Sequence, residues 1–216
     1  MQNNVPQIDL LDQLLFRLSH LEILNHLILI GSWCMYFYQN EFPSEDFSTL
    51  RTRDVDFLVP LPFQSSNSID LEQELVDLGF LVDRHPKGYI KFLHPELMVD
   101  FLTVGRGSLK ERPLKVEKLG IHTQSLQLLD ILTVDTAQVK YKSTKITIPN
   151  PIRFALHKIL ISTRRPTPEK KEKDLRQGLD LLEICRRNEK YRDQIKLTFE
   201  RLHKNRQRKI SKIVTI

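Results

Sequence analysis

The tripeptide Pro149-Asn150-Pro151 divides the chain into two parts of different periodicity, and this division most constrains the fold. Before it, short apolar runs alternate with turn residues, which is typical of strands. After it, apolar residues recur every three or four positions, the period of amphipathic helices. Pro151 suits the first turn of a helix. The sequence therefore predicts an α+β domain over residues 1–150 and a helical subdomain over residues 151–216.

The cysteines and the apolar segments predict a cytoplasmic protein with no membrane association. Among the 216 residues there are two cysteines, Cys34 and Cys185, and neither belongs to a Cys-x-x-Cys pair. This excludes a disulfide scaffold and favours a reducing compartment. The apolar run over residues 23–40 is interrupted by polar residues, so it does not predict a membrane span. The N-terminus lacks the basic segment of a secretion signal.

The charge is unevenly distributed along the chain. Residues 1–150 have 14 Lys and Arg against 19 Asp and Glu, whereas residues 151–216 have 19 against 8, a net charge of +11. A strongly basic segment attracts anionic partners, among them RNA. It has few aromatic residues on which bases could stack, and solvated helices rich in Lys and Arg are an alternative interpretation.

Apolar periodicity predicts a small mixed sheet flanked by helices. Six leucines from Leu10 to Leu21 recur at helical spacing and predict a helix over residues 8–24. Further helices are expected over residues 33–39 and 69–78, the first capped by Ser32. Strands are expected over residues 27–30, 54–59, 80–83, 88–93 and 97–102. The last three are separated by short turns, which predicts an antiparallel meander attached to the first two.

The secondary structure predicted after residue 103 is less complete. Within residues 104–133, the segment 126–132 is compatible with a helix or a strand, and this choice stays open. A hairpin is expected over residues 137–148. Helices are expected over residues 151–162, 169–187 and 189–208.

Three short motifs carry the candidate chemistry. Gly31-Ser32 follows a buried strand, where exposed backbone N–H groups and the Ser32 hydroxyl predict a phosphate site. Asp54 and Asp56 lie two residues apart on a strand, so their carboxylates point to the same face. Asp100 is a third carboxylate in a later apolar strand.

Like charges on one face repel, and a divalent cation is the obvious reason for placing them together. Mg²⁺ takes oxygen ligands, usually one or two carboxylates plus substrate phosphates, and paired ions promote phosphoryl transfer. Each motif alone has an ordinary interpretation: a tight turn, an acidic pair bound to Arg51 or Arg53, and a strand-end carboxylate. Their joint occurrence predicts a site for Mg²⁺, with Mn²⁺ as the alternative metal.

The order of these motifs resembles the nucleotidyltransferase superfamily, whose fold is polymerase-beta-like. The resemblance covers residues 24–103: an apolar-Gly-Ser turn, Asp-x-Asp entering an apolar strand, and a third Asp on a later strand. Residues 151–174 resemble, less specifically, the helical tail of a bacterial nucleotidyltransferase-like group related to abortive-infection and toxin–antitoxin nucleotidyltransferases. One departure is the gap of 21 residues between Ser32 and Asp54, which is longer than in compact members.

By position, the resemblance assigns roles to these residues. Gly31 and Ser32 would hold the triphosphate of an NTP. The catalytic residues and metal ligands would be Asp54, Asp56 and Asp100. Trp33, directly after the turn, would either contact the ligand or anchor the helix in the core.

Basic side chains are candidates for further contacts with the nucleotide, because cations neutralise the charge on phosphoryl oxygens during transfer. These candidates are Arg53, Lys158, Arg165 and Lys173. A solvated or nucleic-acid-facing surface is the alternative for the three in the helical part. Asp174 lies within one helical turn of Lys170 and Lys171, which predicts either a local ion pair or a helix cap.

The leading functional hypothesis is therefore Mg²⁺-dependent transfer of a nucleoside monophosphate from an NTP to a hydroxyl acceptor. That acceptor is the 3′ end of an RNA, a protein or a small molecule. One alternative is a non-catalytic nucleotide- or RNA-binding protein on the same fold. The other is the toxin half of a toxin–antitoxin pair, controlled by an antitoxin or another regulatory partner. The dispersed histidines disfavour a zinc site.

Overall fold

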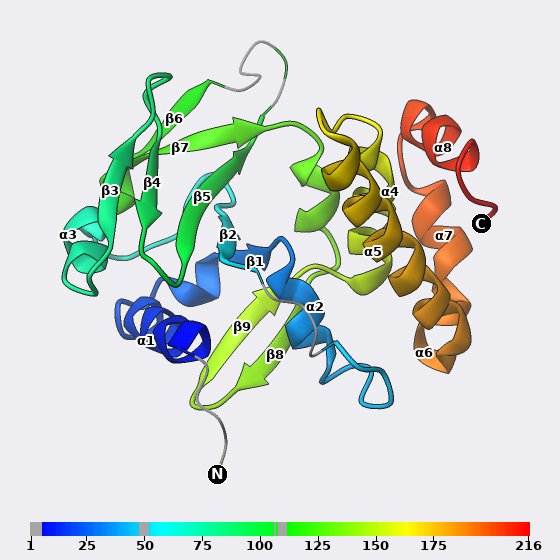
Figure 1. The fold of residues 1–216 in the computed structure, drawn as a ribbon, viewed down its shortest axis with the longest axis horizontal. Coiled ribbons are helices and arrows are strands. Elements are labelled where there is room, and N and C mark those ends of the chain that lie inside the picture. The colour runs from blue at the N-terminus through cyan, green and yellow to red at the C-terminus, as the bar shows by residue number, and fades with distance from the viewer. Residues whose placement is uncertain (1–5, 48–51, 106, 108–111) are drawn as a thin grey trace. The chain divides into compact units, whose positions relative to one another are not determined.

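The computed structural model describes residues 6–47, 52–105, 107 and 112–216. Arg51, one predicted partner of the acidic pair, lies outside the described residues. The chain forms two compact units (Figure 1). The first comprises Met1–Leu129 and Thr136–Ile148, and the second comprises Asp130–Asp135 and Pro149–Ile216. Among the described helices, none has the length and apolar character needed to cross a bilayer.

The first unit contains a mixed sheet with short helices before and between its strands. Its helices are α1 (Pro6–His20), η1 (Leu24–His26), α2 (Trp33–Tyr38), α3 (Leu71–Val76) and η3 (Glu117–Leu119). Its strands are β1 (Ile28–Ile30), β2 (Asp54–Leu58), β3 (Leu81–Arg84), β4 (Ile90–Leu93), β5 (Met98–Val104), β6 (Pro113–Val116), β7 (Ile121–Leu126), β8 (Ala137–Tyr141) and β9 (Thr144–Ile148).

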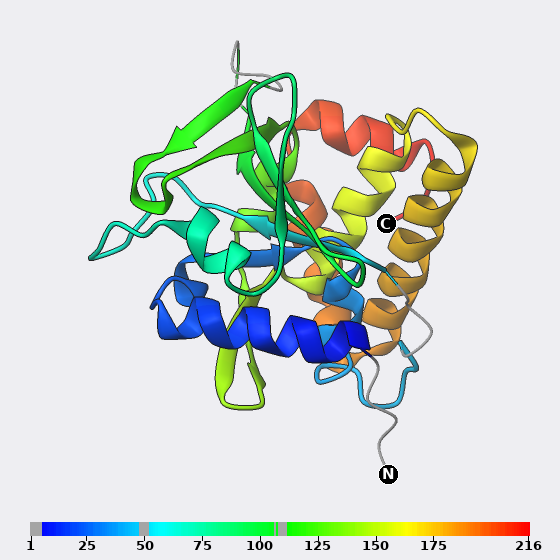
Figure 2. The same cartoon turned by 60° about the vertical axis from the view of Figure 1, so that its left-hand side comes forward.

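The sheet follows the order β1-β2-β5-β4-β3, with β7 pairing β5 and β6 pairing β7. The meander β3-β4-β5 is antiparallel, as predicted, and it joins the first two strands through a parallel β2–β5 pair. Strands β8 and β9 form a separate hairpin, and α1 passes beside it (Figure 2). The predicted α+β class and mixed sheet are confirmed. Residues 104–133 contain the strands β6 and β7, and the segment 126–132, left open between helix and strand, begins at the last residue of β7 and continues into the 3-10 helix η4 (Leu129–Thr133).

Alternation along β2 and β5 separates a buried face of the sheet from a polar face. Phe57 and Phe101 are in register and stack with ring centroids 5.5 Å apart. Both are almost completely buried. Successive residues of a strand point to opposite faces, so the residues before these rings, Asp56 and Asp100, lie on the other face. Burial of the aromatic pair therefore fixes where the carboxylates stand.

The second unit is helical, and its longest helices pack against each other. The helices are α4 (Pro151–Ser162), α5 (Pro168–Arg187), α6 (Glu189–Arg192), α7 (Gln194–Glu200) and α8 (Lys204–Ser211). Asn150 caps α4, because its Oδ1 accepts a hydrogen bond from the backbone N–H of Ile152 at 3.0 Å. Thr167 caps α5 in the same way.

The single helix predicted over residues 189–208 is wrong. The chain turns at Asp193 and again over residues 201–203, so three short helices replace it. Leu202 is buried at the second turn, and the His203 ring accepts a hydrogen bond from the backbone N–H of Asn205 to start α8. Apolar spacing continued through these turns, which explains why periodicity alone missed them.

Gly178 on α5 allows its close approach to α4. A Cβ at this position would lie 2.8 Å from Cγ1 of Ile159 and 2.9 Å from the carbonyl oxygen of Ala155. We expect Gly178→Ala to lower the free energy of unfolding by about 1–3 kcal/mol, because overpacking outweighs the better helix propensity of alanine. Urea denaturation measures this. Arg176→Ala, on the exposed side of α5, is the control and should change little; equal stability of both variants would contradict the packing.

Candidate functional site

The β2–β5 pair brings the predicted carboxylates onto one face of the sheet. Asp56 lies opposite Asp100 on the neighbouring parallel strand, and Ile30 of β1 lies opposite Asp56 on its other side. Cross-strand partners point to the same face, and Asp54 shares that face because it is two residues from Asp56. Asp54 is exposed, whereas Asp56 and Asp100 are half-buried.

Gly31 places the turn after β1 directly against Asp56. Its φ of +75° lies in the left-handed region that favours glycine. A Cβ at this position would lie only 2.2 Å from Oδ2 of Asp56. The turn and the carboxylate therefore share one small space, which a side chain on residue 31 would fill.

Ser32 and Trp33 follow the turn. The predicted capping role of Ser32 is wrong, because its backbone is already helical, with φ −68° and ψ −23°, and its side chain makes no cap hydrogen bond. Trp33 is buried, lies edge-to-face with Tyr36, and its indole N–H has no hydrogen-bond partner. It anchors α2 in the core.

Lys91 is a functional candidate that the sequence reasoning missed. It lies opposite Asp100 on the antiparallel strand β4, and its ammonium forms an ion pair with Oδ2 of Asp100. Burial raises the pKa of the Asp100 carboxyl above its usual value, against the opposing effect of Lys91. Burial also acts to lower the pKa of Lys91, but the hydrogen bond and charge of Asp100 outweigh it and raise that pKa. The register of the predicted meander could have identified this pair.

A magnesium ion fits the oxygen donors on this face. Among the residues that the structure describes, no three His, Cys, Asp or Glu side chains are grouped as a ready-made metal cage. Mg²⁺ does not need one, because it usually takes one or two protein carboxylates and completes its shell with water and substrate phosphates. Asp54 and Asp56, beside the Gly31 turn, offer that donor set.

Arg53 precedes the acidic pair and is exposed. Its guanidinium donates a hydrogen bond to the carbonyl oxygen of His94, at 2.9 Å. This contact joins the start of β2 to the turn between β4 and β5. Arg53 therefore helps to hold the turn that follows Lys91.

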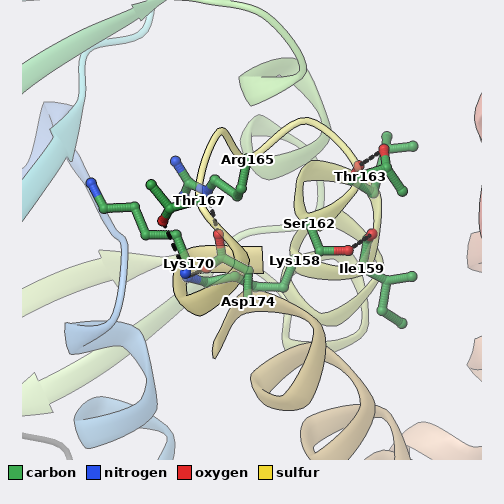
Figure 3. Close-up of polar contacts among 9 residues, drawn as sticks. Lys158, Ile159, Ser162, Thr163, Arg165, Thr167, Lys170 and Asp174 are labelled. Carbon is green, nitrogen blue, oxygen red and sulfur yellow. Dashed lines mark hydrogen bonds and ion pairs between the residues drawn. The ribbon is translucent and has the colours of Figure 1, made fainter. Parts of the chain in front are cut away.

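In the second unit, Asp174 binds two of the basic candidates (Figure 3). Its Oδ1 lies 2.6 Å from Nζ of Lys158, and its Oδ2 is bonded to Nε of Arg165. The side chains of Lys158 and Asp174 are each only 6% exposed. Burial acts to raise the pKa of Asp174, but the two cations outweigh it and lower that pKa. The predicted local pair with Lys170 or Lys171 is wrong, because Asp174 faces α4 instead.

Lys173, the last basic candidate, is exposed on α5.

His157 is a buried residue that was not predicted to be functional. His157 on α4 is buried, and neither ring nitrogen has a hydrogen-bond partner. Burial, together with the neighbouring charge of Lys158, lowers the pKa of His157 to about 3. The ring is therefore neutral in the folded protein near neutral pH.

The sequence matches the family described as Nucleotidyltransferase over residues 10–202. The chain belongs to this nucleotidyltransferase family. The match includes the Gly31 turn, all three aspartates and most of the helical part, so the resemblance drawn from the motifs is confirmed. No curated protein matches the chain by sequence.

Solved structures similar to this nucleotidyltransferase have low sequence identity to it. An antigenic nucleotidyltransferase-like protein from Paracoccidioides brasiliensis is 14% identical, with a TM-score of 0.51 over 82% of this chain and 76% of that one. This likeness shows the fold. The antibiotic-resistance factor ANT(2'')-Ia in solution is 11% identical, with a TM-score of 0.45 over 90% of this chain and 91% of that one. Its complex with adenylyl-2''-tobramycin is 11% identical, with a TM-score of 0.49 over 97% and 100%.

The Gly31 turn yields a first prediction for this nucleotidyltransferase. We expect Gly31→Ala to destabilise the protein, because the added Cβ is both strained and in collision with Asp56. The loss should be about 2 kcal/mol or more by urea denaturation. Gly107→Ala is the matched control, since Gly107 also has a positive φ but its Cβ would meet no atom within 4 Å. Equal losses in the two variants would refute the contact with Asp56.

The neutral His157 ring yields a second prediction. As the pH falls below the ordinary pKa of histidine, His157 becomes protonated in the unfolded chain. In the folded protein the same ring stays neutral until about pH 3. The free energy of unfolding should therefore fall with pH, by about 2 kcal/mol between about pH 7.5 and 5 from this residue. His157→Leu should remove that part of the dependence, whereas exposed His122→Leu should retain it. An unchanged pH dependence in His157→Leu contradicts the buried neutral ring.

Proposed function

We propose that this protein transfers a nucleoside monophosphate from an NTP to a hydroxyl acceptor, with Mg²⁺ or Mn²⁺ bound at Asp54 and Asp56. The observation that carries the proposal is the contact of the Gly31 turn with Asp56, which itself lies in register with Asp100. A tight glycine turn beside three carboxylates on one face supports metal-assisted phosphoryl transfer. Family membership supports transfer of this general kind.

Each residue of the site has its own role in the proposed reaction. The Gly31 turn lets the triphosphate approach the backbone closely, and the Ser32 hydroxyl, which does not cap α2, donates to a phosphate oxygen. The acceptor oxygen attacks the α-phosphorus, its proton passes to the Asp100 carboxylate, and the bond to the β-phosphate breaks to release pyrophosphate. A bound divalent cation supplies charge neutralisation on the phosphates. Asp54 and Asp56 hold that cation.

Basic side chains complete the proposed nucleotide contacts. Arg53 directly precedes Asp54 in the sequence, and its exposure leaves the guanidinium accessible to a phosphate. Asp174 binds both Lys158, whose side chain is buried, and Arg165, whose side chain is 40% exposed and is the more accessible of the two to a phosphate. Lys173 is exposed and accessible. We propose that residues 1–150 are the catalytic domain and that residues 151–216 form a basic helical subdomain.

The acceptor and the cellular setting follow from charge and composition. The basic residues 151–216 favour an anionic acceptor, and we propose RNA ahead of a protein or a small molecule. Reduced cysteines favour a cytoplasmic location. We propose an antitoxin or another regulatory protein as a further partner that controls the activity. None of these assignments is needed for the transfer step itself.

The ion pair between Lys91 and Asp100 favours one second candidate function. Because a lysine satisfies the third carboxylate, the fold would also suit a protein that binds nucleotides without catalysis. The two functions differ in their need for a cation. A binding protein would hold an NTP equally well with and without Mg²⁺.

Transfer of label from α-³²P-NTPs to total RNA, in Mg²⁺ and in chelator, tests the proposal. We expect Asp56→Asn to reduce transfer by about 100-fold or more, because a developing charge loses its neutralising cation. Asp77→Asn is the control, an exposed carboxylate after α3 in the same unit, and should retain activity. Transfer by Asp56→Asn at the control rate would overturn the proposal. NTP binding that is indifferent to Mg²⁺, without transfer, would establish the second candidate.

A further inference from the structure

Four charged residues form one row across the sheet, and the row continues beyond the predicted site. Asp83 of β3 lies opposite Lys91 of β4, Lys91 lies opposite Asp100 of β5, and Asp100 lies opposite Asp56 of β2. Residues in register on neighbouring strands point to the same face. The row therefore presents one cation between carboxylates on a single face of the sheet.

Lys91 is placed to neutralise the site from within the protein. Its ammonium is bonded to Oδ2 of Asp100, and the two side chains are 31% and 21% exposed. At this depth water screens the pair less than it would screen two surface charges. Asp56, the next carboxylate in the row, also attracts the ammonium. Lys91 is therefore close enough to a divalent cation held by Asp56 to repel it.

The charge of the face depends on this lysine. Asp54, Asp56 and Asp100 carry three negative charges when ionised, and Lys91 removes one of them. The remaining two match a single divalent cation. A second cation would have to meet the ammonium at close range and take over the Asp100 oxygen that the ammonium holds, and both requirements oppose binding.

We propose that Lys91 acts as a built-in counter-cation that occupies Asp100 in the free protein and limits the affinity of the site for divalent cations. The inference rests on the proposed function. A lysine suits this role because its compact ammonium sits on a flexible stem and can leave the carboxylate. Asp83, opposite Lys91 on the far side, provides the displaced ammonium with another carboxylate. Cation binding at Asp100 would then be coupled to release of Lys91.

An ordinary cross-strand ion pair is the competing explanation. Such pairs stabilise a sheet modestly and have no bearing on metal affinity. Under both explanations, Lys91→Met removes the ion-pair partner of Asp100 and lowers the free energy of unfolding in the absence of metal. They differ in what the same variant does when a cation is added.

Direct titration with Mn²⁺, followed by electron paramagnetic resonance of the unbound ion, separates the explanations without any assay of activity. We expect Lys91→Met to lower the Kd for Mn²⁺ by about tenfold, because a repelling charge is removed and Asp100 becomes available. Lys91→Arg keeps the charge and should bind Mn²⁺ as the unaltered protein does. Lys145→Met, an exposed lysine on β9, is the matched control and should also leave the Kd unchanged.

Thermal unfolding with and without Mn²⁺ provides a second readout. Ligand binding to the folded state raises the melting temperature, and at a fixed Mn²⁺ concentration the rise grows with the logarithm of the affinity, so it should be larger in Lys91→Met than in the unaltered protein. Should that variant fail to fold, Lys91→Gln, which keeps a hydrogen-bonding side chain, replaces it. An unchanged or higher Kd in the uncharged variants, or no Mn²⁺ binding in any of them, overturns the inference.

The two proposals fail in different ways. Tighter Mn²⁺ binding by Lys91→Met, together with full nucleotide transfer by Asp56→Asn, would uphold the counter-cation and overturn the proposed chemistry. Loss of transfer in Asp56→Asn with an unchanged Kd in Lys91→Met would give the opposite result.

Discussion

The parallel pairing of β2 with β5 is the constraint on which the rest of the site depends. These strands are far apart in the sequence, and their register sets Asp56 beside Asp100 and Phe57 beside Phe101. Burial of the two rings fixes the register, because a slip of either strand by one residue would turn its ring to the polar face and its carboxylate into the core. The packing of one face therefore determines the chemistry of the other.

Electrostatic compensation is the second theme. Carboxylates on a half-buried face repel each other, and the fold offsets this with a lysine from the adjacent strand β4. The second unit solves a similar problem differently, since Asp174 is buried between Lys158 and Arg165 and its pKa is lowered by them. The first pair opens when a divalent cation displaces Lys91 from Asp100, whereas in the second pair Asp174 holds its cations in place.

Much of this architecture could be predicted from local signals, and the exceptions have physical causes. Strand alternation and the Asn150-Pro151 helix start depend on near neighbours, so β1 to β5, the β8–β9 hairpin and α4 agree with the sequence, whereas β6 and β7 were not predicted. The helix expected over residues 189–208 failed because turns at Asp193 and Leu202 preserve apolar spacing. Asp174 was assigned to its own helix because the partner on α4 is a tertiary contact. Lys91 was missed because its significance depends on strand register.

The most direct test of the central claim is a crystal structure with a non-hydrolysable NTP and Mn²⁺, read from the anomalous signal of the metal. The account predicts Mn²⁺ within bonding distance of the Asp54 and Asp56 carboxylates, with the triphosphate against the Gly31-Ser32 backbone. The account would be contradicted by metal and triphosphate bound elsewhere, with Lys91 still paired with Asp100 and no ligand on this face of the sheet.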